Sequence, residues 1–151
     1  MLQAAEDGIK YREGIDDIVI DRETWSALES EVEAAGGKLR AGFPAWLEPL
    51  LIRGTIAITL GRRVYLGREL LRAASADVAA IVAHELAHVR QFARVGPARF
   101  AWRYLRDYAR NRRRGMSAYD AYVAIPFEVE ARLAENRIRS TTAHGARVPP
   151  A

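Results

Sequence analysis

The chain has 151 residues, half of them hydrophobic, with three histidines, no cysteine and a formal net charge of +4. This length and hydrophobic content predict one folded domain with its own core rather than a disordered chain. The lack of cysteine excludes disulfides, thiolate metal ligands and a cysteine nucleophile. No run of about 18 apolar residues could span a bilayer. The acidic residues 1–21 do not resemble a signal peptide, so we expect a cytoplasmic protein.

Charge is distributed unevenly along the chain. Residues 1–35 carry ten acidic and three basic side chains, which gives this segment a formal charge of −7. Residues 90–114 carry nine arginines and one aspartate, which gives +8. This pattern indicates two oppositely charged surfaces, or an acidic segment that packs near the basic one.

The first third of the chain is expected to contain one strand and two helical segments. Residues 15–20 could form a short strand. A helix follows to about residue 35, with Asp21 as its cap and a glycine pair after its last turn. A further turn or short helix is expected over residues 43–47.

The clearest β signal lies between residues 55 and 66. Residues 55–60 are rich in branched side chains, Gly61 and Arg62 can form a turn, and residues 63–66 return, so we expect a β-hairpin. One strand of this hairpin could pair with an extended peptide. It could equally be an ordinary hairpin that covers a helix, because the sequence does not show which strand edge is free.

Residues 84–88 read His-Glu-Leu-Ala-His, which is the HExxH pattern. The flanking residues predict a helix that begins near Ser75 or Asp77, either of which can cap it, and that ends at the Gly-Pro pair after residue 95. Histidines four residues apart project from one face of a helix, so His84 and His88 can reach one tetrahedral zinc ion. Glu85 lies about 100° around the helix. From there it could take a proton from a zinc-bound water.

One side of this helix carries an apolar stripe, and the two histidines lie along its border. The stripe consists of Val78, Ile81, Val82, Leu86, Val89 and Ala93. The opposite side is expected to face away from the core and carries Ala83, Ala87, Arg90 and Arg94. The histidines are therefore expected where a buried helix meets a cleft.

Residues 97–114 predict a second amphipathic helix, ended by Gly115. Its apolar side is expected to contain Phe100, Ala101, Tyr104, Leu105 and Tyr108. Its opposite side carries Arg99, Arg103, Arg106 and Arg110. Such a helix could bind nucleic acid or an anionic membrane surface. Because the aromatic side chains are expected to face away from the arginines, base stacking is disfavoured, and we expect a solvated or acid-paired face.

The last third of the chain is expected to contain a connector and a final helix. The connector, residues 119–125, includes Tyr119 and Tyr122, which could supply an oxyanion donor or simply pack in the core. The helix is expected from Pro126, which suits a first helical turn, to about Arg139.

This organisation predicts one domain over residues 1–140 and a disordered tail over residues 141–151. His144 lies in the predicted tail. We therefore expect it to be a bystander rather than a metal ligand, since a ligand would need an ordered tail.

A catalytic zinc usually has three protein ligands and one open position, so a third ligand is required. The HExxHxxGxxH pattern fails here, because Gln91 and Arg94 occupy its Gly and His positions. An acid from the final helix remains, and Glu128 and Glu130 are the candidates. Helical angles do not separate the two glutamates, because they flank the two sides of an apolar stripe formed by Phe127, Ala131, Ala134 and Ile138. Gln91 could hydrogen-bond within the cleft or lie on plain surface.

Two stretches resemble small bacterial zincin-like metallopeptidase domains of the gluzincin type. They are HELAHVRQ at residues 84–91, an HExxHxxQ sequence, and IPFEVEAR at residues 125–132. The resemblance covers roughly residues 43–139 and includes the hairpin. Through the Glu-x-x-Ala motif of gluzincins, it implies that Glu128 is the third ligand. Arg132 replaces the Asp or Asn that ends that motif, a residue that commonly orients a zinc-binding histidine.

The fold expected from residues and resemblance together is α+β: a mostly helical zincin-like domain with a small antiparallel β-hairpin or sheet packed on the HExxH helix. The expected function is that of a zinc metallopeptidase acting on a peptide or protein substrate. Zn²⁺ is expected on His84, His88 and Glu128, with Glu85 as general base. The alternative is a zincin-like module that binds zinc for a structural or interaction role without turnover. A nucleic-acid partner is not expected, and the oligomeric state stays open.

Overall fold

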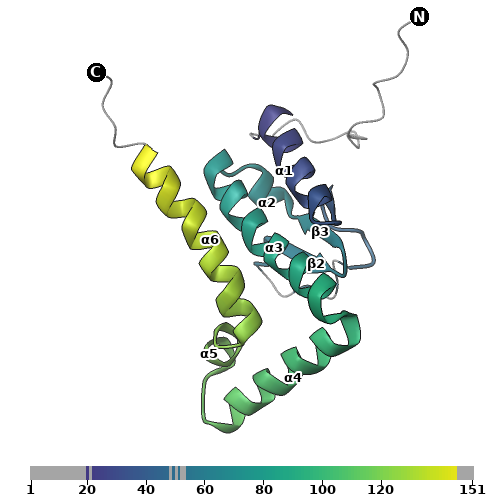
Figure 1. Cartoon of the computed structure of the whole chain (residues 1–151), viewed down its shortest axis with the longest axis vertical. Coiled ribbons are helices and arrows are strands. Elements are labelled where there is room, and N and C mark those ends of the chain that lie inside the picture. The colour runs from purple at the N-terminus through teal and green to yellow at the C-terminus, as the bar shows by residue number, and fades with distance from the viewer. Residues whose placement is uncertain (1–19, 21, 48, 50, 52–53, 146–151) are drawn as a thin grey trace, which may run out of the picture.

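The computed structural model describes the chain except residues 1–19, 21, 48, 50, 52–53 and 146–151, and it has a mostly helical α+β fold (Figure 1). The helices are α1 (Arg22–Ala34), α2 (Arg68–Leu71), α3 (Ser75–Val95), α4 (Pro97–Arg113), α5 (Ala118–Val123) and α6 (Pro126–Gly145). The strands are β1 (Lys38–Ala41), β2 (Ala57–Leu60) and β3 (Arg63–Leu66). The fold class is therefore the expected one.

The sheet is mixed rather than purely antiparallel. β2 and β3 form the expected antiparallel hairpin, and Gly61 in its turn has a φ of 64°, a conformation that favours glycine. β1 pairs with β3 in parallel, which the sequence did not predict, and Leu39 lies opposite Val64. The strand order β1-β3-β2 places β2 at one edge of the sheet.

The main core lies between α1, the sheet and one side of α3. It contains Trp25, Leu28 and Val32 of α1, together with Val64, Leu66 and the predicted apolar stripe of α3 from Val78 to Val89. Ala93, which was also predicted in this stripe, is exposed. Ile20 also packs into this core, while the rest of the strand expected over residues 15–20 lies outside the described residues. The core therefore supports the face of α3 that contacts β2 and β3.

The opposite side of α3 is also covered, because α6 packs along it (Figure 1). The prediction that this side faces away from the core was wrong for Ala87, which is 6% exposed, whereas Arg94 is exposed as expected and pairs with Glu130 of α6 on the surface. Arg90 is exposed as expected. Contacts from Asp77 to Arg139 and from Arg94 to Glu130 show that the two helices run antiparallel. The HExxH helix is thus held from two sides.

A second apolar cluster joins the end of α3 to α4, α5 and α6. The Phe100 ring stacks on Phe92 at 4.2 Å and on Phe127 at 4.6 Å between centroids, and Ile125 is fully buried beside them. The expected connector contains a short helix, α5, whose Ser117 side chain caps it by accepting a hydrogen bond from a backbone N–H. This cluster fixes the start of α6 against α3.

The final helix is longer than expected. α6 continues past the predicted end at Arg139 to Gly145, so residues 141–145 are helical rather than the start of a tail. The side chain of His144 and residues 146–151 lie outside the described part of the chain. None of the described helices has the length and apolar character needed to cross a bilayer.

Candidate metal centre

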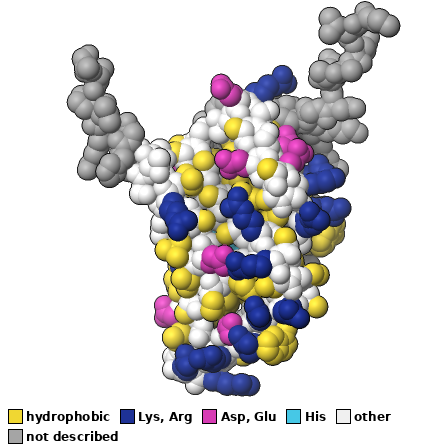
Figure 2. All heavy atoms as spheres, in the orientation of Figure 1, with side chains coloured by type: hydrophobic (Ala, Val, Ile, Leu, Met, Phe, Trp, Pro, Cys, Tyr) yellow, Lys and Arg dark blue, Asp and Glu magenta, His cyan; other side chains and the backbone are white. Residues whose placement is uncertain are grey.

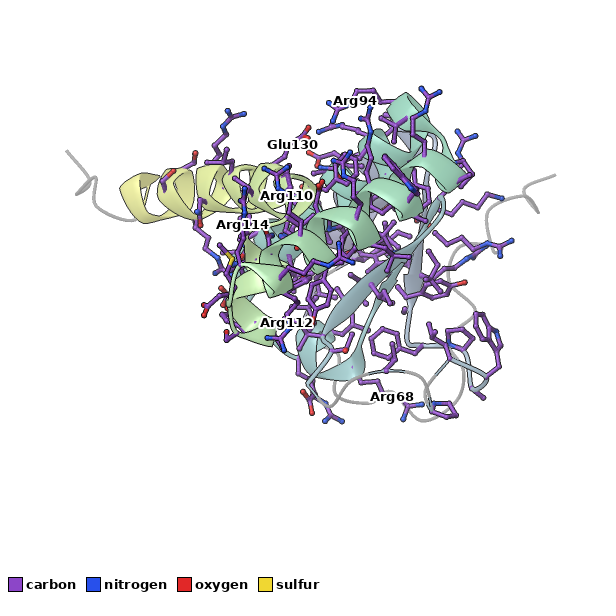
Figure 3. The ribbon with its side chains drawn as sticks, turned by 90° about the horizontal axis from the view of Figure 1, so that it is seen from below. Arg68, Arg94, Arg110, Arg112, Arg114 and Glu130 are labelled. Atoms are coloured by element: carbon purple, nitrogen blue, oxygen red, sulfur yellow. The ribbon has the colours of Figure 1, made fainter. Side chains whose placement is uncertain are left out.

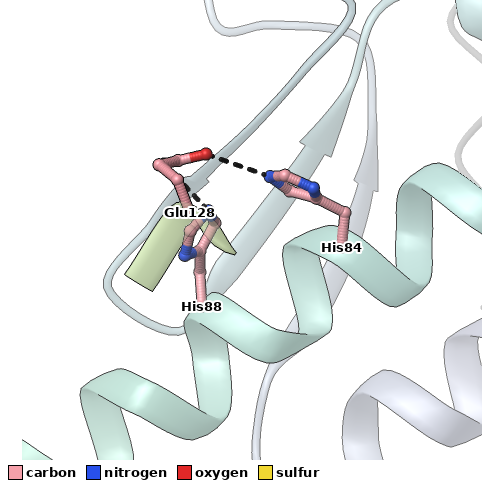
Figure 4. Close-up of side chains that lie close together, drawn as sticks. All are labelled: His84, His88 and Glu128. Atoms are coloured by element: carbon pink, nitrogen blue, oxygen red, sulfur yellow. Dashed lines mark ion pairs between the residues drawn. The ribbon is translucent and has the colours of Figure 1, made fainter. Parts of the chain in front are cut away.

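Two adjacent helices bring a carboxylate against the two imidazoles of the HExxH helix (Figure 4). His84 and His88 project from α3, one turn apart, and Glu128 reaches them from the first turn of α6. The His84 Nε2 atom is 3.5 Å from Glu128 Oε2, and His88 Nε2 is 3.4 Å from Glu128 Oε1. One ligand atom from each of the three residues lies within 4.8 Å of the other two, so this group could hold a metal ion.

The far side of each imidazole is held by an acceptor. His88 Nδ1 lies 2.9 Å from Gln91 Oε1, and the Gln91 amide donates to the Phe127 carbonyl at 3.0 Å. His84 Nδ1 lies 3.2 Å from Glu135 Oε2. Because a carboxylate oxygen and an amide oxygen accept hydrogen bonds, both contacts place a proton on Nδ1. The Nε2 atom of each ring then has its lone pair available on the side of Glu128.

This arrangement fits a bound cation. Bare Nε2 lone pairs and carboxylate oxygens repel one another unless a positive charge lies between them. Glu128 Oε2 is buried and has no hydrogen-bond partner among the described residues. Zinc ligands at about 2.0–2.1 Å in tetrahedral geometry are separated by roughly 3.4 Å. The His84 Nε2–Glu128 Oε2 and His88 Nε2–Glu128 Oε1 distances of 3.5 and 3.4 Å, each to a different carboxylate oxygen, are close to that separation.

Without a metal, protons can occupy the same space. Burial disfavours the charged form of His88, but the hydrogen bond to Glu128 and the charge of Glu85 outweigh it, so the pKa of His88 is raised. Burial also opposes the charged form of Glu128, yet the neighbouring imidazoles of His84 and His88 and the Tyr104 hydroxyl hold its pKa well below the usual range. Glu128 is therefore ionised, as a metal ligand must be.

The Glu128 carboxylate is also bound by a tyrosine of α4. Tyr104 donates its hydroxyl hydrogen to Glu128 Oε1 at 2.8 Å. Burial and the nearby charge of Glu128 raise the pKa of Tyr104, so its hydroxyl stays protonated and remains a donor. Nothing in the spacing of α4 distinguishes Tyr104 from the other aromatic residues of its apolar side, which is why sequence reasoning missed it.

Glu85 lies on the same cleft but outside this group of three. Its side chain is buried, and Thr59 of β2 donates a hydrogen bond of 2.6 Å to its Oε2 atom. Burial raises the pKa of Glu85, although His88 and Thr59 partly oppose the shift. A carboxylate whose pKa is raised toward neutrality is suited to accept and release a proton.

The cleft beside the centre has a volume of about 540 Å³ and a mostly apolar lining. β2 provides Ile58 and Thr59 to one wall, while Phe100 and Leu105 of α4 belong to the other. Tyr122 also lines the cleft, whereas Tyr119 is 69% exposed and does not. The size is within the range of small-molecule and peptide side-chain pockets.

The structure separates the two candidate glutamates by position. Glu130 lies on the outer surface, where both carboxylate oxygens accept hydrogen bonds from Arg94 at 3.2 and 2.9 Å (Figure 3). Glu128 instead faces the imidazoles. Glu135 was missed by sequence reasoning, although its spacing of seven residues from Glu128 places both glutamates on one face of α6. Arg132, at the position that departs from the related motif, contacts the Tyr122 ring at 5.7 Å.

Comparison with known families identifies one match. The model of the eCIS core domain matches residues 53–96, which include the hairpin, α2 and the whole HExxH helix. The match ends before α4 and does not reach Glu128 in α6. No curated protein and no solved structure matches the chain. The chain is therefore similar to the eCIS core domain over the segment that provides His84, Glu85 and His88.

Proposed function

We propose that this protein is a zinc-dependent peptidase of the zincin-like type. The observation that carries the proposal is the position of Glu128, which faces the Nε2 atoms of His84 and His88 at 3.5 and 3.4 Å, with Glu85 on the same cleft. Two imidazoles and one carboxylate form the ligand set of several zinc proteases, which keep a fourth position open for water or substrate. The gluzincin resemblance supports the same three ligands.

The residues around the centre have different roles in the proposed reaction. A bound zinc ion supplies Lewis acidity, which acidifies a water and polarises a carbonyl group. Glu85 takes the proton of the attacking water and delivers it to the leaving nitrogen as the peptide bond breaks. Thr59 fixes one oxygen of Glu85, so the other oxygen is the one that exchanges the proton. Glu135 and Gln91 orient the two imidazoles.

A peptide substrate is supported by the strand beside the cleft. β2 is an edge strand of the described sheet, and Ile58 and Thr59 of this strand line the cleft. An extended peptide can add to such an edge through backbone hydrogen bonds while one side chain enters the apolar cleft. Because β3 lies between β1 and β2, the hairpin strand at the edge of the described sheet is β2.

The proposal is tested by comparing metal content and hydrolysis in two variants. Purified protein should contain about one zinc per chain. Glu85→Gln should keep the zinc and lose hydrolysis of a mixed peptide library, because it removes the base and no ligand. Glu130→Gln is the matched control and should keep both, since its side chain lies on the outer surface.

Three results would contradict parts of this assignment. Protein that neither contains nor takes up zinc would exclude the metal centre. A Glu85→Gln variant with unchanged hydrolysis would exclude the general base. Zinc at full occupancy without hydrolysis of any library member would favour the alternative, a zinc-binding structural or interaction module.

A further inference from the structure

The solvent-facing side of α4 combines exposed apolar side chains with arginines. Trp102 is 60% exposed and Leu105 is 67% exposed, although Leu105 was expected on the buried side of this helix. The buried stripe of α4 is narrower than predicted, because it contains Phe100 and the polar residues Asp107 and Asn111. We define the α4 outer face as the exposed surface formed by Trp102, Leu105, Arg99, Arg106, Arg110 and Arg113.

Among the described residues, little negative charge opposes the positive charge of this face. The only acid of α4, Asp107, is 9% exposed and accepts hydrogen bonds from Arg106. No acidic side chain of the described residues forms an ion pair with Arg99, Arg110 or Arg113. Figure 2 shows dark blue basic side chains beside a yellow apolar patch at the lower end of the molecule, where α4 lies in Figure 1.

The acidic helix α1 does not neutralise these arginines. The charge pattern left open whether the acidic segment of residues 1–35 packs near the basic helix, and residues 1–19 and 21 of this segment lie outside the described part of the chain. In the structure α1 packs on β1 and α3, at the end of the molecule away from α4 (Figure 1). The basic surface continues toward the end of α4, where Arg110, Arg112 and Arg114 are located (Figure 3). This surface therefore has the charge that attracts an anionic partner.

We propose that the α4 outer face docks on an anionic lipid surface. Trp102 and Leu105 lie along one side of the arginine row, so they can enter the interface between headgroups and acyl chains while the arginines contact the lipid phosphates. The Arg106 guanidinium, 4.8 Å from the centre of the Trp102 ring, keeps the charge beside the apolar group. Leu105 and Ala101 are exposed and also line the cleft, so docking places this side of the cleft next to the membrane.

The chemistry of the face favours lipid over nucleic acid. A nucleic acid would find no hydrogen-bond donor in the Leu105 side chain of this face. Single-stranded nucleic-acid sites stack successive bases on several aromatic rings, whereas Trp102 is the one aromatic residue among those that form the α4 outer face. A lipid surface uses the apolar and the basic side chains together. This proposal does not depend on hydrolysis or on a bound metal.

Vesicle binding by the full chain tests the proposal. The protein should co-sediment with vesicles of phosphatidylcholine and phosphatidylglycerol, and not with phosphatidylcholine alone. Arg99→Gln with Arg110→Gln should weaken this binding about thirtyfold, since each arginine contributes about 1 kcal/mol near an anionic surface. Trp102→Ala should weaken it about tenfold. Added salt should weaken it as well, because the charges lie in water before docking.

Matched controls distinguish vesicle binding through the α4 outer face from non-specific adsorption of the protein. Arg90→Gln with Arg137→Gln removes two exposed arginines elsewhere, and Leu133→Ala removes an apolar side chain of α6 that is 55% exposed. Both controls should bind vesicles as the parent does. Equal losses in controls and test variants would overturn the proposal, as would the absence of binding to anionic vesicles. Salt-sensitive binding to duplex DNA or RNA without vesicle binding, or self-association lost in Trp102→Ala without vesicle binding, would assign the face to another partner and overturn it.

Discussion

Glu135 should determine how tightly the protein holds a metal, although it is not one of the three candidate ligands. Its Oε2 atom lies 3.2 Å from His84 Nδ1, on the side of the ring opposite Glu128. The Glu135 carboxylate is itself held by Arg139 at 3.1 Å, and Arg139 donates to Asp77 on α3 at 2.6 Å. Glu135 therefore fills the histidine-orienting role for which Arg132 is unsuited, from one helical turn further along α6.

The expected loss of zinc affinity on replacing Glu135 follows from its hydrogen bond with His84 Nδ1. A hydrogen bond to a charged group contributes about 1.5–3 kcal/mol net. The side chains of His84 and Glu135 are 12% and 19% exposed, so partial screening favours the lower half of that range. At about 1.4 kcal/mol per factor of ten, Glu135→Ala should weaken zinc binding roughly tenfold to thirtyfold. Glu135→Gln should lose only about threefold, because its amide oxygen can still accept from Nδ1, as Gln91 does for His88.

Zinc affinity is best measured by competition with a chromophoric chelator at fixed pH. Glu130→Ala is the matched control, since it removes a glutamate of the same helix that binds Arg94 on the surface. Unfolding of the metal-free variants should be measured in parallel, so that lost affinity is not confused with lost folding. Equal affinity in the parent and Glu135→Ala, or an equal loss in Glu130→Ala, would refute the orienting role. Near-parental zinc affinity in Glu135→Gln would show that the hydrogen bond to His84, and not the packing of the Glu135 side chain, accounts for the effect.

Two further predictions concern the ligand choice and the support of the sheet. Glu128→Ala should weaken zinc binding more than Glu135→Ala does, whereas Glu130→Ala should leave it nearly intact; zinc titrations with the reverse ranking of Glu128 and Glu130 would contradict the centre described above. Gly67→Ala should destabilise the fold by about 1–3 kcal/mol in denaturant unfolding, because overpacking costs that much. The added Cβ would lie 2.9 Å from the Phe43 ring and 3.0 Å from the Ile56 carbonyl oxygen, and unchanged stability would show that these neighbours can move.

The local parts of the fold were predictable because their signals are local. The Gly-Pro pair after residue 95 and the β-branched runs around Gly61 correctly predicted the end of α3 and the β2–β3 hairpin. β1 was missed because its sequence, Lys-Leu-Arg-Ala, has one buried apolar residue and its parallel partner is distant in the chain. Parallel pairing leaves no turn signal between the two strands.

The candidate site was predictable only in part, because some of its residues come from elements that are distant in the chain. The spacing of His84 and His88 shows that one metal can bind both, since one helix determines their geometry. Periodicity could not choose between Glu128 and Glu130, because both flank the apolar stripe of α6. The choice depends on which flank meets α3, and that is decided by tertiary packing. Tyr104 and Thr59 belong to other elements and reach the site only through the fold.

The packing that brings α6 to the site depends on small side chains, and Ala87 tests this dependence. Ala87 lies on α3 between His84 and Gln91, which both contact α6, and it is 6% exposed. The sequence predicts that Ala87 faces away from the core. In the structure its side chain is buried, and its small size lets α3 and α6 approach closely. Ala87→Leu should destabilise the protein by about 1–3 kcal/mol and weaken zinc binding, because the larger side chain pushes α6 and its ligand away from α3. Ala93→Leu, an exposed position of the same helix, should change stability by less than about 0.5 kcal/mol. Denaturant unfolding and zinc titration of both variants would show the difference, and an Ala87→Leu protein with parental stability and affinity would mean that close α3–α6 packing does not hold the third ligand in place.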